Sequence, residues 1–272
     1  MGKIKRRTSG DPTFPLQEKS VPDGRTDFVL AHVTPVGRAR EIIRSGKIET
    51  RHCDIFGRSL NYFFALRPAY RRKDSGEQSD QLDRFPFVFL LSSNHLPPPH
   101  QIYPFDTGGA IDGAFDEKAN EYVFLEDYRL GPTYEAISGH IQWAFGSREN
   151  YYDGTLQLGL ENSLPFHETA ALSYLNIAGL ATIGSNKPDY RASALEVSFD
   201  RHIPITGNVN FIILPRQFLE DPRGDNDQMI RSLKDANIAW DFYEWEPNRA
   251  PDEFRREINS LVKARLIAIG QL

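Results

Sequence analysis

The sequence contains very little cysteine. Cys53 is the only cysteine among the 272 residues, so the chain cannot form an internal disulfide or a metal cluster held by thiolates. His52 precedes Cys53 and could act as a base for a reactive thiol. Neighbouring side chains on an extended segment, however, point to opposite faces. We therefore interpret Cys53 as an ordinary thiol.

Long apolar runs are also missing. No stretch approaches the roughly 20 apolar residues that a membrane-spanning helix needs. Residues 1–7 are basic, but no apolar run follows them, so we expect no secretory signal here. We expect a cytoplasmic protein with no membrane partner. The formal net charge of −5 gives no support to broad electrostatic capture of nucleic acid, although a local basic patch stays open.

Several common catalytic motifs are absent. The sequence has no P-loop, no Gly-x-Gly-x-x-Gly after a strand, no His-Glu-x-x-His and no Gly-x-Ser-x-Gly. The function classes that depend on these motifs are therefore disfavoured, and we expect no metal. Any chemistry must come from residues that are dispersed along the chain.

The composition is that of a globular protein, with 40% hydrophobic and 25% charged residues. Residues 1–26 are rich in Lys, Arg, Pro, Ser and Gly, which predicts a flexible basic arm. Such an arm could contact a polyanion or remain a solvated tail. With no internal repeat and no long linker, residues 27–272 are predicted to form a single domain.

Apolar periodicity predicts an α+β fold. Thr34 is expected to be a helix N-cap, with Pro35 at the first helical position and Gly46 at the stop. Further helices are expected at 131–145, 166–183, 229–236 and 251–269, and strands at 28–32, 60–66, 85–91, 194–199, 209–214 and 240–245. Because strands and helices do not alternate regularly, a doubly wound parallel sheet is disfavoured.

His32 lies where the first predicted strand meets the first predicted helix. An imidazole at this place can reach into a cleft beside a sheet, and a helix start offers unpaired backbone N–H groups. The alternative is a structural histidine.

An aromatic strand is the second candidate. Alternation puts Tyr62 and Phe64 on one face and Phe63 on the other. This strand forms either part of the core or a stacking surface for a flat ring such as nicotinamide. Arg67 and Arg71 follow in a proline-containing turn, where two guanidinium groups suit a diphosphate, unless they are surface cations.

Glu196 is the third candidate, since it interrupts an apolar strand. A carboxylate there must face solvent, a partner or a cleft.

Two other segments stand out. Residues 105–110 predict a turn that allows close approach of the backbone to a neighbouring group. An aromatic set could form an acceptor pocket or belong to the core; it consists of Trp143, Phe145, Tyr151, Tyr152 and His167.

The order of His32-Val33-Thr34, the Tyr62 strand and Glu196 resembles the His–Tyr–Glu arrangement of the ADP-ribosyltransferases. This group is related in fold to diphtheria toxin and the poly(ADP-ribose) polymerases. The spacing and the late strand also look like the DNA-targeting bacterial toxins of the DarT kind. The resemblance covers about residues 28–71 and 189–214, and it implies split mixed or antiparallel sheets with flanking helices.

The resemblance also implies roles for individual residues, with NAD as substrate. His32 would hydrogen-bond the adenosine ribose, and Thr34 would hold the same loop. Tyr62 would stack on nicotinamide, with Phe63 beside it in the cofactor site. Glu196 would be catalytic together with Tyr62, because a developing oxocarbenium-like cation needs a fixed anion nearby.

Arg67 or Arg71 would bind the diphosphate, and His140 is a further candidate for the NAD cleft.

The sequence departs from the cholera-toxin-like branch, since it lacks an early Arg and a Ser-Thr-Ser. Ala194 stands two residues before Glu196, where enzymes that modify protein arginine often carry Gln or Glu. Arginine is therefore a disfavoured acceptor.

Three hypotheses follow from the resemblance. The first is a mono-ADP-ribosyltransferase that modifies a nucleic acid base or a protein, as a toxin or anti-phage effector with an antitoxin partner. The second is an NAD glycohydrolase, in which water replaces the acceptor. The third is a non-catalytic binding domain of the same fold.

Overall fold

The computed structural model describes residues 3–21, 23–69, 76–182, 188–220 and 226–272. The chain divides into two compact units, each built from three separate stretches. Unit 1 comprises Met1–Thr26, Cys53–Arg58 and Pro98–Phe199, and unit 2 comprises Asp27–His52, Ser59–Pro97 and Asp200–Leu272.

Unit 2 is organised around a mixed sheet with the strand order β10-β9-β5-β1-β4. Strand β5 pairs antiparallel with β1 and β9, and β1 pairs antiparallel with β4, whereas β10 pairs parallel with β9. The bounds are β1 (Val29–Pro35), β4 (Arg58–Ala65), β5 (Pro86–Ser92), β9 (Val209–Pro215) and β10 (Ala239–Tyr243). The central strand β5 is almost wholly apolar and buried, as expected for a strand covered on both faces.

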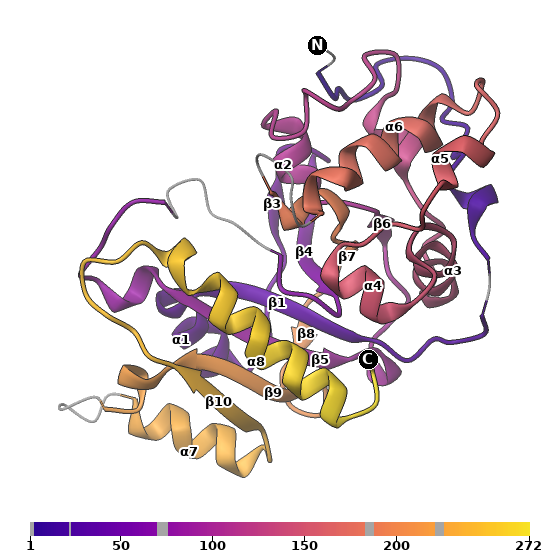
Figure 1. Cartoon of the computed structure of the whole chain (residues 1–272). Helices are drawn as coiled ribbons and strands as arrows, with labels where there is room; N and C mark the ends of the chain where they lie inside the picture. The colour runs from indigo at the N-terminus through magenta and orange to yellow at the C-terminus, as the bar shows by residue number, and fades with distance from the viewer. Residues whose placement is uncertain (1–2, 22, 70–75, 183–187, 221–225) are drawn as a thin grey trace. The chain divides into compact units, whose positions relative to one another are not determined.

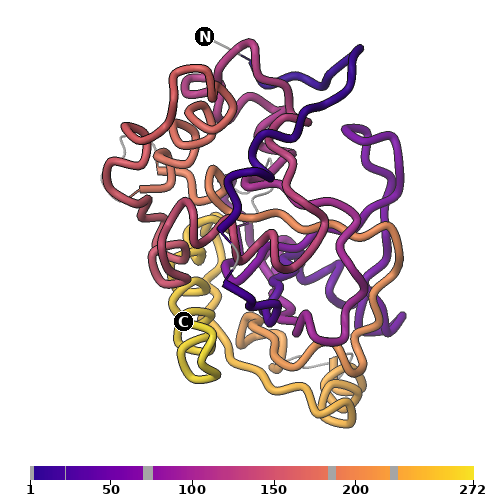
Figure 2. Tube along the Cα trace, turned by 90° about the vertical axis from the view of Figure 1, so that its right-hand side faces the viewer, coloured from indigo at the N-terminus to yellow at the C-terminus, as the bar shows by residue number. Residues whose placement is uncertain are grey.

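The helices described around this sheet are α1 (Val36–Ser45), α7 (Asp227–Asp235) and α8 (Arg255–Ala268). Helix α8 lies along the sheet and contacts β9 and β10, burying Ile258, Val262 and Leu266 (Figure 1). Figure 2 follows the trace from the side and shows this last helix, in yellow, reaching the C-terminus. The short strands are β2 (Lys47–Ile48), β3 (Arg51–Cys53) and β8 (Ile203–Pro204), and the 3-10 turns are Leu82–Arg84, Ser93–His95, Arg216–Phe218 and Pro251–Phe254.

Unit 1 is mostly helical around one antiparallel strand pair. Strands β6 (Gln101–Tyr103) and β7 (Glu196–Phe199) pair with Tyr103 opposite Glu196. The helices are α2 (Thr107–Ile111), α3 (Tyr134–Phe145), α4 (Arg148–Asp153), α5 (Leu160–Ser163) and α6 (Thr169–Ala178), with 3-10 turns at Gln17–Lys19, Leu125–Tyr128, Gly179–Ala181 and Tyr190–Ser193. None of the helices described in either unit has the length and apolarity needed to cross a membrane.

The predicted α+β class is confirmed, but the predicted start of the first helix is wrong. Strand β1 runs through Thr34 and Pro35, and helix α1 begins at Val36. The cause is tertiary: Pro35 still pairs with β5, and the N–H of Val36 donates to the carbonyl of Phe85. Sheet pairing therefore takes the place of the expected Thr34 cap. Gly46 ends the helix as predicted, in the left-handed conformation with φ 71°.

The strand that carries Glu196 starts two residues later than predicted. Residues 190–193 form a 3-10 turn, and Asp189 caps that turn by accepting a hydrogen bond from the N–H of Arg191. Glu196 is consequently the first residue of β7 rather than a mid-strand residue. It lies at a strand end, beside the turn that carries Arg191.

The N-terminal segment packs within unit 1. Ile4 and Leu16 are buried, and the N–H of Leu125 donates to the carbonyl of Lys5. The composition of residues 1–26, which predicts a flexible arm, does not reveal these two core positions. The single domain over residues 27–272 stays a prediction.

Candidate functional site

Unit 2 contains a pocket of about 460 Å³ beside β1, α1 and β4. His32, Thr34 and Tyr62, three of the predicted cofactor residues, line it. The Nδ1 atom of His32 lies 2.8 Å from the main-chain carbonyl oxygen of Tyr62, which joins the two strands at the pocket wall. The structure therefore brings these three residues together in one cavity.

The His32 ring is held in a defined orientation. It packs on Phe63 and Phe89, with ring centroids 5.2 and 6.3 Å away. Burial lowers the pKa of His32 to about 4, while the bond to the Tyr62 carbonyl opposes this shift and the Arg51 charge adds to it. His32 is neutral near pH 7, and Nδ1 carries the proton because it faces a carbonyl. Its Nε2 atom then serves as a hydrogen-bond acceptor.

Phe63 and Arg67 are not brought to this pocket. Phe63 is fully buried, and its ring packs against that of His32. Arg67 is 1% exposed and follows Leu66, whose φ is 61°. Neither residue belongs to the pocket lining. Arg71, the other predicted diphosphate ligand, lies outside the described residues.

The cations that line the pocket are Arg38, Lys47 and Arg51. Arg38 forms an ion pair with Glu41, and Lys47 lies 3.2 Å from Glu49. Arg51 is 3.6 Å from Glu41, so these charges are partly balanced within the lining. None of the three was predicted from the sequence, because isolated surface cations have no distinguishing pattern.

Asn61 supports the pocket wall from below the surface. It is 4% exposed, and its amide nitrogen donates to the carbonyls of Ile48 and Arg201 at 3.2 and 2.9 Å. Both carbonyls border the short β2–β8 pair, so Asn61 ties this pair to β4. Burying a side-chain amide that donates twice favours one fixed arrangement of the wall.

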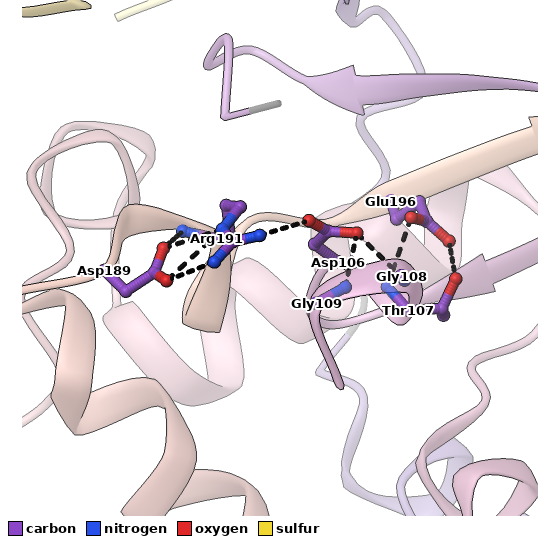
Figure 3. A network of polar contacts seen from close by, with 7 residues as sticks. All are labelled: Asp106, Thr107, Gly108, Gly109, Asp189, Arg191 and Glu196. Carbon is purple, nitrogen blue, oxygen red and sulfur yellow. Dashed lines mark hydrogen bonds and ion pairs between the residues drawn. The ribbon is translucent and has the colours of Figure 1, made fainter. Parts of the chain in front are cut away.

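Glu196 lies in unit 1, where its carboxyl group is almost fully buried. The hydroxyl of Thr107 donates to Oε1 at 2.6 Å, and the N–H of Thr107 donates to Oε2 at 3.2 Å. Figure 3 shows these two contacts on opposite oxygens of the same carboxyl group. Glu196 therefore has a partner, and the alternative of a solvent-facing carboxylate is wrong.

A second carboxyl group, that of Asp106, lies next in this network. Its Oδ1 accepts from the N–H groups of Gly108 and Gly109 at 3.0 and 3.2 Å, which caps α2. Its Oδ2 lies 3.4 Å from Nη1 of Arg191. Arg191 is also bound to Asp189, with Nη2 donating to Oδ2 at 2.6 Å (Figure 3).

The two carboxyl groups influence each other's protonation. Burial raises the pKa of Glu196 well above its ordinary value, and the charge of Asp106 raises it further, while the bonds from Thr107 oppose the shift. Burial also raises the pKa of Asp106, but the Arg191 charge lowers it. Since two adjacent buried carboxylates repel, Arg191 favours Asp106 as the ionised member and leaves the proton on Glu196.

His140 is part of an aromatic cluster in unit 1. Its ring packs against Tyr174, Trp143 and Phe145, with centroids 4.8, 5.4 and 6.5 Å away. Neither ring nitrogen has a hydrogen-bond partner among the described residues, and burial lowers the pKa to about 3. This environment is that of a neutral core histidine.

The aromatic set predicted as an acceptor pocket or core separates into two groups. The core interpretation is confirmed for Trp143, Phe145, Tyr151 and Tyr152, all of which are buried. His167 instead lines a different pocket of about 350 Å³ in unit 1, together with Arg7 and Tyr122.

Asp106 and Thr107 were not identified as site residues from the sequence, although residues 105–110 predict a turn whose backbone closely approaches a neighbouring group. The detectable signal is the Asp-Thr-Gly-Gly run, since Asp is a strong N-cap and glycine lets neighbours come close.

The described residues contain no group of three or more His, Cys, Asp or Glu side chains able to hold a metal ion. No model of a protein family, no curated protein and no solved structure matches this chain.

Proposed function

We propose that the chain is an NAD-dependent mono-ADP-ribosyltransferase that modifies a macromolecular acceptor, either a nucleic acid base or a protein. The observation that carries this proposal is the linkage of His32 and Tyr62 in one pocket, on neighbouring strands β1 and β4. These are two of the three residues by which the sequence resembles ADP-ribosyltransferases. The mixed sheet of unit 2 and the strand pair of unit 1 agree with a fold of that type.

The pocket supplies suitable chemistry for one part of NAD. Neutral His32 presents Nε2 as an acceptor for a ribose hydroxyl, while its Nδ1 is occupied by the Tyr62 carbonyl. The half-buried Tyr62 ring offers a stacking face for nicotinamide. Lys47 and Arg51 supply positive charge for a diphosphate.

In its ionised form, Glu196 supplies the anion that the reaction needs. As the bond between ribose C1′ and the nicotinamide nitrogen breaks, its electron pair returns to the ring, and nicotinamide leaves as a neutral molecule. Positive charge develops on the ribose, and a carboxylate stabilises it. The acceptor atom then bonds to C1′ and loses its proton, which Glu196 can take.

Incubation with NAD labelled in its adenine tests the proposal. Transfer of label to DNA, RNA or protein, with release of nicotinamide, supports it. Free ADP-ribose without labelled macromolecule would indicate a glycohydrolase, and binding without turnover would indicate a non-catalytic domain. Each of the last two results contradicts transferase activity.

Glu196→Ala should abolish nicotinamide release while leaving the circular dichroism spectrum unchanged. Glu161→Ala is a matched control, because Glu161 is an exposed glutamate of α5 in the same unit. An unchanged rate in Glu196→Ala would show that Glu196 is not catalytic. In bacteria, toxicity that disappears with Glu196→Ala would support a role as a toxin or anti-phage effector.

A further inference from the structure

The network around Glu196 contains three residues to which the proposed reaction gives no role. We propose that Thr107, Asp106 and Arg191 are positioning residues that fix the Glu196 carboxyl group and set its proton affinity. This inference rests on the proposed function, since it deepens the role of Glu196.

Thr107 fixes the orientation of the carboxyl group. Its hydroxyl and its own N–H reach the two different carboxyl oxygens, so a single residue determines the plane of the group. Thr107 is 1% exposed and Glu196 is 4% exposed. Water therefore does not compete for these bonds, and both are stronger than they would be at a surface.

Asp106 in turn fixes Thr107. By capping the N–H groups of Gly108 and Gly109, it holds the first turn of α2, in which Thr107 is the first helical residue. The glycines make this arrangement possible. A Cβ atom on Gly109 would lie 3.1 Å from Nη1 of Arg191 and 3.3 Å from Oδ2 of Asp106.

Arg191 determines which carboxyl group is ionised. It contacts Asp106 and Asp189, and its positive charge favours the ionised form of Asp106. The Asp106 anion then increases the proton affinity of Glu196, whereas the donors of Thr107 decrease it. Tyr103 is a further titratable side chain near Glu196, because the two residues are paired directly opposite each other on β6 and β7.

A glutamate whose proton affinity is raised is suited to act as a general base. It can receive the proton that the acceptor loses and release it to solvent at the end of the cycle. The opposing effects of Asp106 and Thr107 tune this property. Changes at these two residues should therefore move the ionisation of Glu196 in opposite directions.

The test uses Thr107→Val, Thr107→Ser and Asp106→Asn, with Asp112→Asn as control. Asp112 is an exposed acid at the end of the same helix. Two measurements are made: kcat and KM for NAD against pH, and the infrared carboxyl band of ¹³C-glutamate-labelled protein. The band of Glu196 is identified by its loss in Glu196→Gln.

Thr107→Val should lower kcat roughly tenfold or more at neutral pH and change KM by less than about threefold. It should also move the acid limb of the kcat–pH profile to higher pH. Thr107→Ser, which keeps the hydroxyl, should restore the wild-type profile. Asp106→Asn should move the acid limb of the kcat–pH profile and the pH midpoint of the Glu196 infrared band to lower pH. Asp112→Asn should leave both unchanged.

The inference is overturned if Thr107→Val and Asp106→Asn leave the Glu196 band midpoint in place, or move it in the same direction. If Thr107→Val does not fold, Asp106→Asn alone decides the question, because its amide retains the cap of α2. Absence of NAD turnover in the wild type would overturn the proposed function only. The infrared midpoints would still establish or refute the network.

Discussion

The imidazole of His32 and the main-chain carbonyl of Tyr62 are joined by a 2.8 Å hydrogen bond between adjacent strands. One ring nitrogen is thereby committed to the fold and the other is left to a ligand. This division of the ring gives a direct way to separate the structural role of His32 from its proposed role in binding.

His32→Asn keeps a donor near the position of Nδ1 but lacks the acceptor at Nε2, whereas His32→Gln places its amide near the position of Nε2. We expect His32→Asn to raise KM for NAD on the order of tenfold, as for a lost hydrogen bond, with kcat less affected. His32→Gln should retain more affinity. Calorimetric titration with NAD measures the affinity of each variant. Equal affinities in the two variants would argue against the Nε2 contact.

The cations of the pocket give a second prediction. Arg51→Gln should weaken NAD binding and reduce its dependence on salt concentration, because Arg51 lines the pocket. Arg44→Gln is the control, since Arg44 is exposed on α1 and outside the lining. The assignment of the diphosphate to this pocket fails if both variants bind NAD like the wild type.

Glu196 should make the folded state sensitive to alkaline pH. Its pKa is raised in the folded protein, so its stabilising contribution is complete below the ordinary glutamate value and is lost as pH rises through the folded value. Glu196→Gln keeps a neutral side chain, and the Thr107 hydroxyl can accept from its amide. The variant should be more stable than the wild type at pH 8 and similar at pH 4, by urea unfolding. A variant that is destabilised at pH 8 contradicts this sign.

His140 should act in the opposite direction, on the acid side. Its pKa falls from 6.5 to about 3 on folding, so the stability of the neutral ring is present above pH 6.5 and is lost as pH falls towards 3. The loss amounts to at most about 3 kcal/mol at pH 4. His140→Phe should remove this part of the acid dependence, as measured by unfolding between pH 4 and 7. Parallel curves for the two proteins would show that His140 is not buried as a neutral ring.

The fold was predictable where local signals agree with tertiary contacts. Gly46 ends α1 because only a left-handed residue fits there, and this requirement is visible in the sequence. Thr34 shows the opposite case, since a good cap residue remains in a strand that pairs with β5. Propensity describes what a segment prefers alone, whereas pairing depends on a strand more than fifty residues away.

The site was predictable to a similar degree. Glu196 was identifiable because an acid in an apolar strand demands a partner, and Tyr62 because aromatic strands are rich in binding surfaces. The partner itself, Thr107, was not identifiable from the sequence. Its role arises from the placement of α2 beside β7, and hydroxyl residues are too common for one of them to stand out.

The buried positions of Ile4 and Leu16 affect how the protein should be handled. A shortened protein that begins at residue 27, the boundary that composition suggests, would lose two core side chains and the hydrogen bond from Leu125 to Lys5. Such a truncation would expose apolar surface of unit 1 and favour aggregation. Expression should therefore retain these N-terminal residues, and an inactive truncated protein would report a damaged core rather than a missing activity.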